Sequence, residues 1–141
     1  MIEAYIIYLP ESKKSSASAK LVEKSLNESI VYVDVNLHEG VDRYQAWQKY
    51  IDSGFRPRDI GKFGGGKIDA ELGVFYSHYS LWEKAIELDR NIIILEHDAI
   101  FNNDKAITYK NTLDSKVLLN FDGDILNLGS PNWSFKPWSP T

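Results

Sequence analysis

The chain alternates short apolar runs with longer segments in which apolar residues recur at helical spacing. Apolar or β-branched runs bounded by turn residues are typical of strands, and they occur at Ala4–Pro10, Ser29–Asn36, Ile92–Leu95 and Asp124–Gly129. Helical spacing occurs at Ser15–Asn27, Val41–Ile51 and Ala70–Leu88, the last with Asp69 as the expected N-cap. Strands that alternate with helices predict an α/β fold: a mostly parallel, Rossmann-like sheet with flanking helices.

Composition narrows the class of protein. A chain of 141 residues with 43% hydrophobic residues fits one domain, which buries roughly two-thirds of its unfolded surface. No apolar run approaches the ~20 residues of a membrane span and no signal segment opens the chain, so we expect a cytoplasmic protein with no membrane span. Zero cysteines exclude disulfides and thiolate metal sites. A net charge of -4 gives no general attraction to nucleic acid.

The third apolar run ends in an acid, an imidazole and an acid: Glu96, His97 and Asp98. Ligands of open parallel sheets bind outside the carboxyl ends of the strands, where this triplet is expected. Along an extended chain Glu96 and Asp98 share one side, so their carboxylates could hold a hard divalent cation, directly or through water. A solvated strand end or a helix cap would show the same triplet, so the pattern alone leaves both interpretations open.

The segment Ala70–Leu88 places two titratable residues, Glu71 and His78, within a broad apolar arc. The arc is formed by Leu72, Val74, Phe75, Tyr76, Tyr79, Leu81, Trp82, Ala85 and Ile86. The polar side is expected to hold Ser77, Ser80, Lys84 and Glu87. A polar group on a core-facing arc needs a partner. Glu71 and His78 could therefore belong to a site; alternatively, His78 bonds a neighbouring backbone group and Glu71 favours the positive helix start.

A glycine-rich segment, Phe55–Ile68, precedes this helix and is predicted to be a loop. It contains four glycines and four cations, Arg56, Arg58, Lys62 and Lys67. Its glycines permit close backbone approach, so the loop could close over a diphosphate. A surface loop without a ligand is the alternative.

The sequence "AELGVFYSHYSLWEKAIELDRNIIILEHDAIF" resembles the signature of glycosyltransferase family 25, which is close to G-E-x-G-C-x-x-S-H-x-x-x-W followed by a strand ending in E-D-D. The opening "AYIIYLP" and the segment Asp122–Leu128 resemble further parts of that family. Three positions depart from its pattern: Ala70, Val74 and His97. The residues that fall on the signature are Glu71, Gly73, Ser77, His78, Trp82, Glu96 and Asp98.

The resemblance implies the nucleotide-binding half of a GT-A glycosyltransferase over residues 1–129, followed by an irregular aromatic tail at 130–141. It implies transfer of a hexose from a UDP-hexose, typically UDP-galactose, to a hydroxyl of a glycan or lipooligosaccharide acceptor, with inversion. A divalent metal, Mn²⁺ or Mg²⁺, would be held by Asp98 and Glu96. The donor would be bound by Glu71, Ser77, His78, Lys67 and Glu96.

Family members usually continue well beyond the position that matches Gly129, and the catalytic base is expected there. Within this chain, Asp122 and Asp124 are the fallback candidates. We therefore expect binding of the donor without transfer. The tail exposes Trp133, Phe135 and Trp138, which could cover a sheet edge or pair two chains into a homodimer.

Two other hypotheses remain from the sequence. The first is an inactive, truncated relative that binds a sugar nucleotide or a partner protein. The second is a metal-dependent phosphate-ester hydrolase that uses Glu96 and Asp98 without any sugar.

Overall fold

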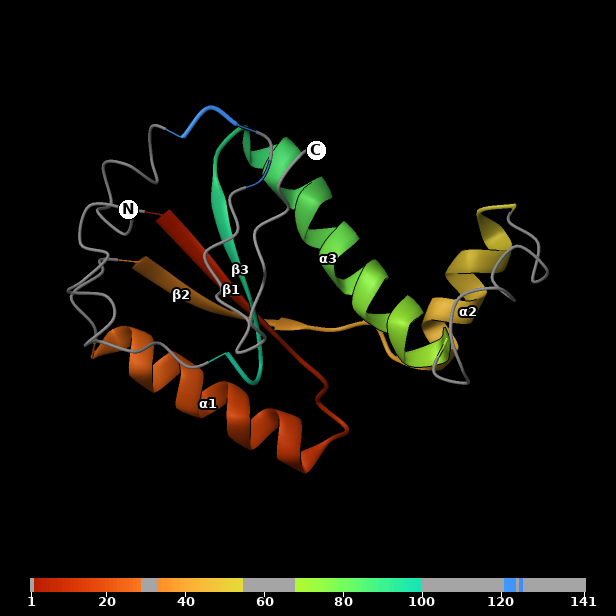
Figure 1. Cartoon of the computed structure of the whole chain (residues 1–141), viewed down its shortest axis with the longest axis horizontal. Helices are drawn as coiled ribbons and strands as arrows, with labels where there is room; N and C mark the ends of the chain where they lie inside the picture. Colours follow the sequence, from red (N-terminus) through yellow and green to blue (C-terminus); the bar gives the residue numbers. More distant parts are fainter. Residues whose placement is uncertain (1, 29–32, 55–67, 100–120, 124, 126–141) are drawn as a thin grey trace, which may run out of the picture.

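The computed structural model describes residues 2–28, 33–54, 68–99, 121–123 and 125 (Figure 1). The elements in chain order are β1 (Ile2–Tyr8), α1 (Lys13–Asn27), β2 (Val33–Glu39), α2 (Arg43–Asp52), α3 (Ile68–Leu88) and β3 (Ile92–Glu96). The predicted alternation of strands and helices is confirmed over these ranges. The glycine-rich loop is predicted to end at Ile68, but this residue begins α3; the rest of that loop, all but one residue of the fourth predicted strand, and the aromatic tail lie outside the described residues.

The three strands form one parallel sheet in the order β2-β1-β3. Tyr8 pairs with Glu39 of β2 and Ile7 pairs with Glu96 of β3, so the carboxyl ends of all three strands meet at one edge. The strand that follows β1 in the chain lies on one side of it, and β3 lies on the other. The sheet is therefore Rossmann-like, with the reversal of strand order at β1.

Helices cover both faces of the sheet (Figure 1). Successive side chains of a strand point to opposite faces, so β1 is buried on both sides. On one face Ile6 packs against α1, in a cluster with Ala19, Val22 and Leu26. On the other face Tyr5 and Ile7 pack against Leu81 of α3. Ile6 and Leu81 are fully buried and form the centres of the two layers.

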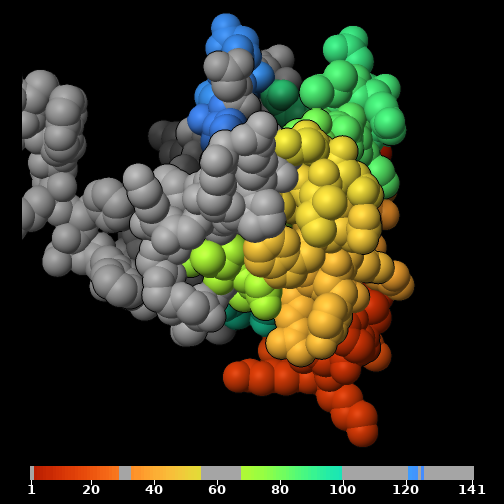
Figure 2. Space-filling model, turned by 90° about the vertical axis from the view of Figure 1, so that its right-hand side faces the viewer, coloured from red at the N-terminus to blue at the C-terminus, as the bar shows by residue number. Residues whose placement is uncertain are grey.

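Helix α2 lies away from the sheet and packs against the first half of α3 (Figure 1), and the two helices are side by side on the face shown in Figure 2. Their shared cluster contains Ala46, Tyr50 and Tyr76. The start of α2 is fixed by a capping box, in which Asp42 accepts from the backbone N–H groups of the first turn and Gln45 bonds back to the Asp42 N–H. Because α2 lies beside α3, the connection between β2 and α2 passes across α3.

The predicted buried face of α3 is wrong in part. Ser77, expected on the polar side, is only 2% exposed, and it lies on the buried face with Gly73, Tyr76 and Leu81. Several members of the predicted apolar arc remain exposed instead: Val74, Phe75, Tyr79, Trp82 and Ile86. The physical reason is that the backbone of the β2–α2 connection packs on α3 at Gly73 and Ser77. Only small residues on the helix leave room for this backbone.

The predicted N-cap of this helix is also wrong. The helix begins at Ile68, so Asp69 lies inside the first turn. Its carboxylate accepts a hydrogen bond from the indole N–H of Trp47 on α2. Asp69 therefore joins two helices and does not cap one.

Candidate active site

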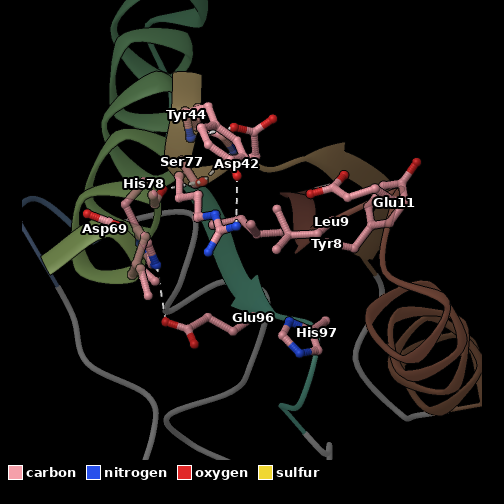
Figure 3. Close-up of a pocket in the computed structure, with 16 residues that line it drawn as sticks. Tyr8, Leu9, Glu11, Asp42, Tyr44, Asp69, Ser77, His78, Glu96 and His97 are labelled. Atoms are coloured by element: carbon pink, nitrogen blue, oxygen red, sulfur yellow. Dashed lines mark hydrogen bonds and ion pairs between the residues drawn. The ribbon is translucent and has the colours of Figure 1, made fainter. Parts of the chain in front are cut away.

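A cavity of about 650 Å³ lies at the carboxyl edge of the sheet (Figure 3). Its walls come from the end of β1 and the turn after it, the β2–α2 connection, the first half of α3 and the end of β3. Ligands of open α/β sheets bind at this edge, where the strand order reverses. The lining residues are Ile7, Tyr8, Leu9, Glu11, Val41, Asp42, Arg43, Tyr44, Asp69, Ala70, Gly73, Val74, Ser77, His78, Glu96 and His97.

The β2–α2 connection is held against α3 by Ser77 and Gly73. The Ser77 hydroxyl accepts from the Val41 backbone N–H at 2.8 Å and donates to the Gly73 carbonyl at 2.7 Å. A Cβ added to Gly73 would lie 2.8 Å from the Val41 carbonyl oxygen, so only glycine allows this approach. The Gly40 N–H also bonds the Tyr8 carbonyl at 2.7 Å. These contacts fix one wall of the cavity.

His78 and Glu96 meet across the cavity from two different elements. His78 Nε2 lies 3.4 Å from Glu96 Oε1, and Figure 3 shows the side chains pointing toward each other. Their side chains are 27% and 51% exposed, so both remain accessible to a ligand. His78 therefore has a side-chain partner, and the backbone alternative raised by the sequence is not what the structure shows.

The acidic triplet is not extended. Strand β3 ends at Glu96, and the Ala99 N–H donates to the Glu96 carbonyl at 3.0 Å, which closes a turn. The expectation that Glu96 and Asp98 share one side of an extended chain is therefore wrong, because the alternation of a strand stops at Glu96. Glu96 and His97 line the cavity, whereas Asp98 is exposed and is not among the lining residues.

The other predicted site residues are distributed differently. Glu71 is exposed on α3 and does not line the cavity. Asp122 follows Phe121, whose carbonyl accepts from the Asn91 amide at 2.8 Å. Asn91 precedes β3, so this contact lies at the opposite end of the strand from Glu96. Lys67 and Asp124 lie outside the described residues.

The sequence interpretation missed the contribution of Asp42, Arg43 and Tyr44, which begin α2 at the cavity. The available signal was the capping box formed by Asp42 and Gln45, which marks a helix start shortly after a strand. A helix that starts there presents its first residues at the carboxyl edge of the sheet. Arg43 thereby enters the site, although the cationic residues considered from the sequence lie in the segment Phe55–Ile68.

The electrostatic balance of the described cavity wall is negative. Four carboxylates line it, from Glu11, Asp42, Asp69 and Glu96, against the single guanidinium of Arg43. Three of the four have a partner, because Asp42 caps α2, Asp69 accepts from Trp47 and Glu96 contacts His78. Within the ranges that the structure describes, no group of three or more His, Cys, Asp or Glu side chains is arranged to hold a metal ion. An anionic ligand would need a cation beside it in this cavity.

The fold and the cavity together define an α/β protein with a cavity at the carboxyl ends of its parallel strands, the edge where ligands of such sheets bind. In a comparison with protein families, residues 66–137, just over half of the chain, match glycosyltransferase family 25, described as an LPS biosynthesis protein. The chain therefore belongs to glycosyltransferase family 25, whose reaction takes a sugar donor and an acceptor. The matched segment includes Gly73, Ser77, His78 and Glu96.

No curated protein and no solved structure gives a significant match. Over the described part of the chain, no helix has the length and apolar character needed to cross a membrane.

Proposed function

We propose that the cavity binds a UDP-hexose, with UDP-galactose as the first candidate, as the donor for inverting transfer to a hydroxyl of a glycan or lipooligosaccharide acceptor. The observation that carries this proposal is the meeting of His78 and Glu96 in a cavity at the carboxyl edge of the sheet. Both residues lie in the segment that matches the glycosyltransferase family. A nucleoside diphosphate sugar is a ligand of the kind that binds at such an edge.

A divalent metal, Mn²⁺ or Mg²⁺, fits the chemistry of the wall. Such ions are often held by one or two carboxylates together with phosphate oxygens of the substrate, so a complete protein cage is not needed. Glu96 borders the cavity and Asp98 follows it in the turn, and these two carboxylates are the proposed ligands. When bound, the metal would neutralise the departing diphosphate.

The protein groups have separate tasks in this proposal. His78 holds the Glu96 carboxylate at the cavity edge, and Ser77 keeps the β2–α2 wall in place through Val41. Inverting transfer also requires a base within hydrogen-bond reach of the acceptor hydroxyl. Asp122 and Asp124 remain proposals for that base, although the Phe121–Asn91 contact places Asp122 toward the other end of β3.

Ligand binding is the first test. In a thermal-shift and calorimetric screen, we expect UDP and UDP-galactose to raise the melting temperature with Mn²⁺ and to lose this effect with a chelator. Absence of binding by any uridine nucleotide, with or without metal, would contradict the proposal.

Release of UDP on addition of an acceptor would identify a transferase, whereas binding without release would identify an inactive sugar-nucleotide-binding protein. Phosphate release from simple esters would favour a hydrolase.

The metal ligands are tested by variants of the turn. We expect Asp98→Ala to abolish the metal-dependent part of UDP binding and His97→Asp to preserve or strengthen it, because the second variant adds a carboxylate. Asp52→Ala, which removes an exposed carboxylate from α2 outside the cavity, is the matched control. Metal-dependent binding that is equal in Asp98→Ala and in the control would remove Asp98 from the proposed site.

A further inference from the structure

Arg43 is the only lysine or arginine among the described residues that line the cavity. It is the first residue of α2, and its side chain is exposed. Within the described ranges it forms no ion pair with a carboxylate of the wall: Glu96 is paired with His78, and Asp42 is committed to the helix cap. Arg43 therefore has no direct carboxylate partner within the described part of the protein, although the cavity wall as a whole is negative.

The guanidinium of Arg43 is held by its neighbour. Arg43 Nη2 donates to the Tyr44 hydroxyl at 2.8 Å, and the guanidinium carbon lies 4.7 Å from the centre of the Tyr44 ring. Tyr44 is 71% exposed, so its ring contributes little to the core. It lies beside the cavity in Figure 3. One hydrogen bond to Tyr44 leaves the other guanidinium N–H groups available to a ligand.

The backbone of Arg43 is positioned by residues of the family signature. Ser77 bonds the Val41 N–H, and the absence of a side chain at Gly73 admits the Val41 carbonyl. Asp42 then caps the helix that begins with Arg43. Residues inside the matched segment thus determine the place of a residue that lies outside it.

We propose that Arg43 binds the diphosphate of the nucleotide donor, with Tyr44 as a positioning residue that holds the guanidinium over the cavity. This inference rests on the proposed function, since it concerns the same ligand. A guanidinium has a planar fork of donors that matches two phosphate oxygens at once, and its charge offsets part of the negative wall. The nucleoside part of the ligand would not depend on Arg43.

The test is calorimetric titration of the full chain with UDP and with uridine, both in the presence of Mn²⁺. We expect Arg43→Gln to weaken UDP binding about ten- to hundredfold, the range of a lost charged hydrogen bond, and to leave uridine binding unchanged. Arg43→Lys should retain part of the affinity, because it keeps the charge and loses the fork. Tyr44→Phe should cause a smaller loss that is confined to UDP.

Lys49→Gln is the matched control, because it removes one positive charge from the same helix at a residue that does not line the cavity. Unfolding midpoints of all variants should agree, since Arg43 and Lys49 are exposed. If the unaltered chain binds UDP and Arg43→Gln binds it as well as Lys49→Gln does, this inference is overturned and the proposed function stands. If the unaltered chain binds no UDP, both are overturned.

Discussion

Two junctions border the cavity, one after β1 and one after β2, and each is held by a nearly fully buried serine. In the β1–α1 junction the Ser15 hydroxyl accepts from the Leu9 N–H at 2.9 Å, six residues away. In the β2–α2 junction the Ser77 hydroxyl accepts from the Val41 N–H at 2.8 Å, 36 residues away. The chemistry is the same, but the first contact is local and the second is made by a helix that arrives later in the chain.

The difference shows which wall of the cavity depends on tertiary structure. The β1–α1 junction has a second local contact, since the Ser12 N–H donates to the Leu9 carbonyl at 3.0 Å. The β2–α2 junction is placed by Ser77 and by the space at Gly73, both within the family match. The glycine and serine of the family signature therefore position the backbone that forms this wall of the cavity.

The largest expected effect comes from Ser77→Ala. It leaves the Val41 N–H without its partner, so we expect a loss of about 1 to 3 kcal/mol in the free energy of unfolding. UDP affinity should also fall, because the wall that carries Arg43 is released. Urea denaturation and titration with UDP and Mn²⁺ measure the two effects.

Ser15→Ala is the matched control for that variant, and we expect a smaller loss because the Ser12–Leu9 contact remains. Equal losses of stability and of UDP affinity in the two variants would contradict the distinction between a local and a tertiary junction.

The variant Gly73→Ala tests the close approach of the Val41 carbonyl to α3. In an ordinary helix interior this change stabilises by about 1 kcal/mol. Here the new Cβ would meet the Val41 carbonyl, and overpacking costs about 1 to 3 kcal/mol, so we expect a net loss of about 1 kcal/mol. A gain in the free energy of unfolding, measured by urea denaturation, would show that the connection moves aside easily.

The variant His78→Ala tests whether His78 contributes to ligand binding or only to the stability of the fold. His78 is partly exposed and contacts Glu96, so we expect weaker binding of the sugar nucleotide, by about tenfold, with a loss of stability below about 1 kcal/mol. Tyr79→Ala, at the next and exposed position, serves as the control for binding. A fall in melting temperature with unchanged affinity would assign His78 to the fold alone.

The smallest expected effect is a pH dependence of the free energy of unfolding, caused by His38 on the face of the sheet that α3 covers. Burial lowers the pKa of His38 below its usual 6.5, and the charge of Lys84 adds to this, against an opposing effect of Glu39. His38 also contacts the Ser80 hydroxyl at 3.0 Å, and its ring lies nearly perpendicular to the Tyr5 ring. The folded state therefore favours the neutral imidazole.

The unfolded chain takes up the proton more readily than the folded protein, so stability is highest above pH 6.5 and falls as the pH drops toward the folded pKa. Urea denaturation at pH 7.5 and 5.5 measures this loss, which should shrink in His38→Gln. An identical pH dependence in the variant would exclude His38 as its source. On the α1 side the buried cluster is apolar, so it offers no corresponding titration.

Much of the candidate site could be predicted from the sequence because its spacing is specific. The signature singled out Ser77, His78 and Glu96, and all three line the cavity. The order of strands and helices also followed from local periodicity, because burial of both faces of β1 requires an apolar run. These features depend on residues close together in the chain.

Only the tertiary structure decided which face of α3 is buried and which cation enters the site. A helical wheel ranks residues by hydrophobicity, so it could not foresee that a backbone segment would pack on Gly73 and Ser77. Arg43 reaches the cavity because α2 starts at the carboxyl edge and is held there by α3. Such placements arise from contacts between distant segments, whose close approach depends on the absence of a side chain as much as on the presence of one.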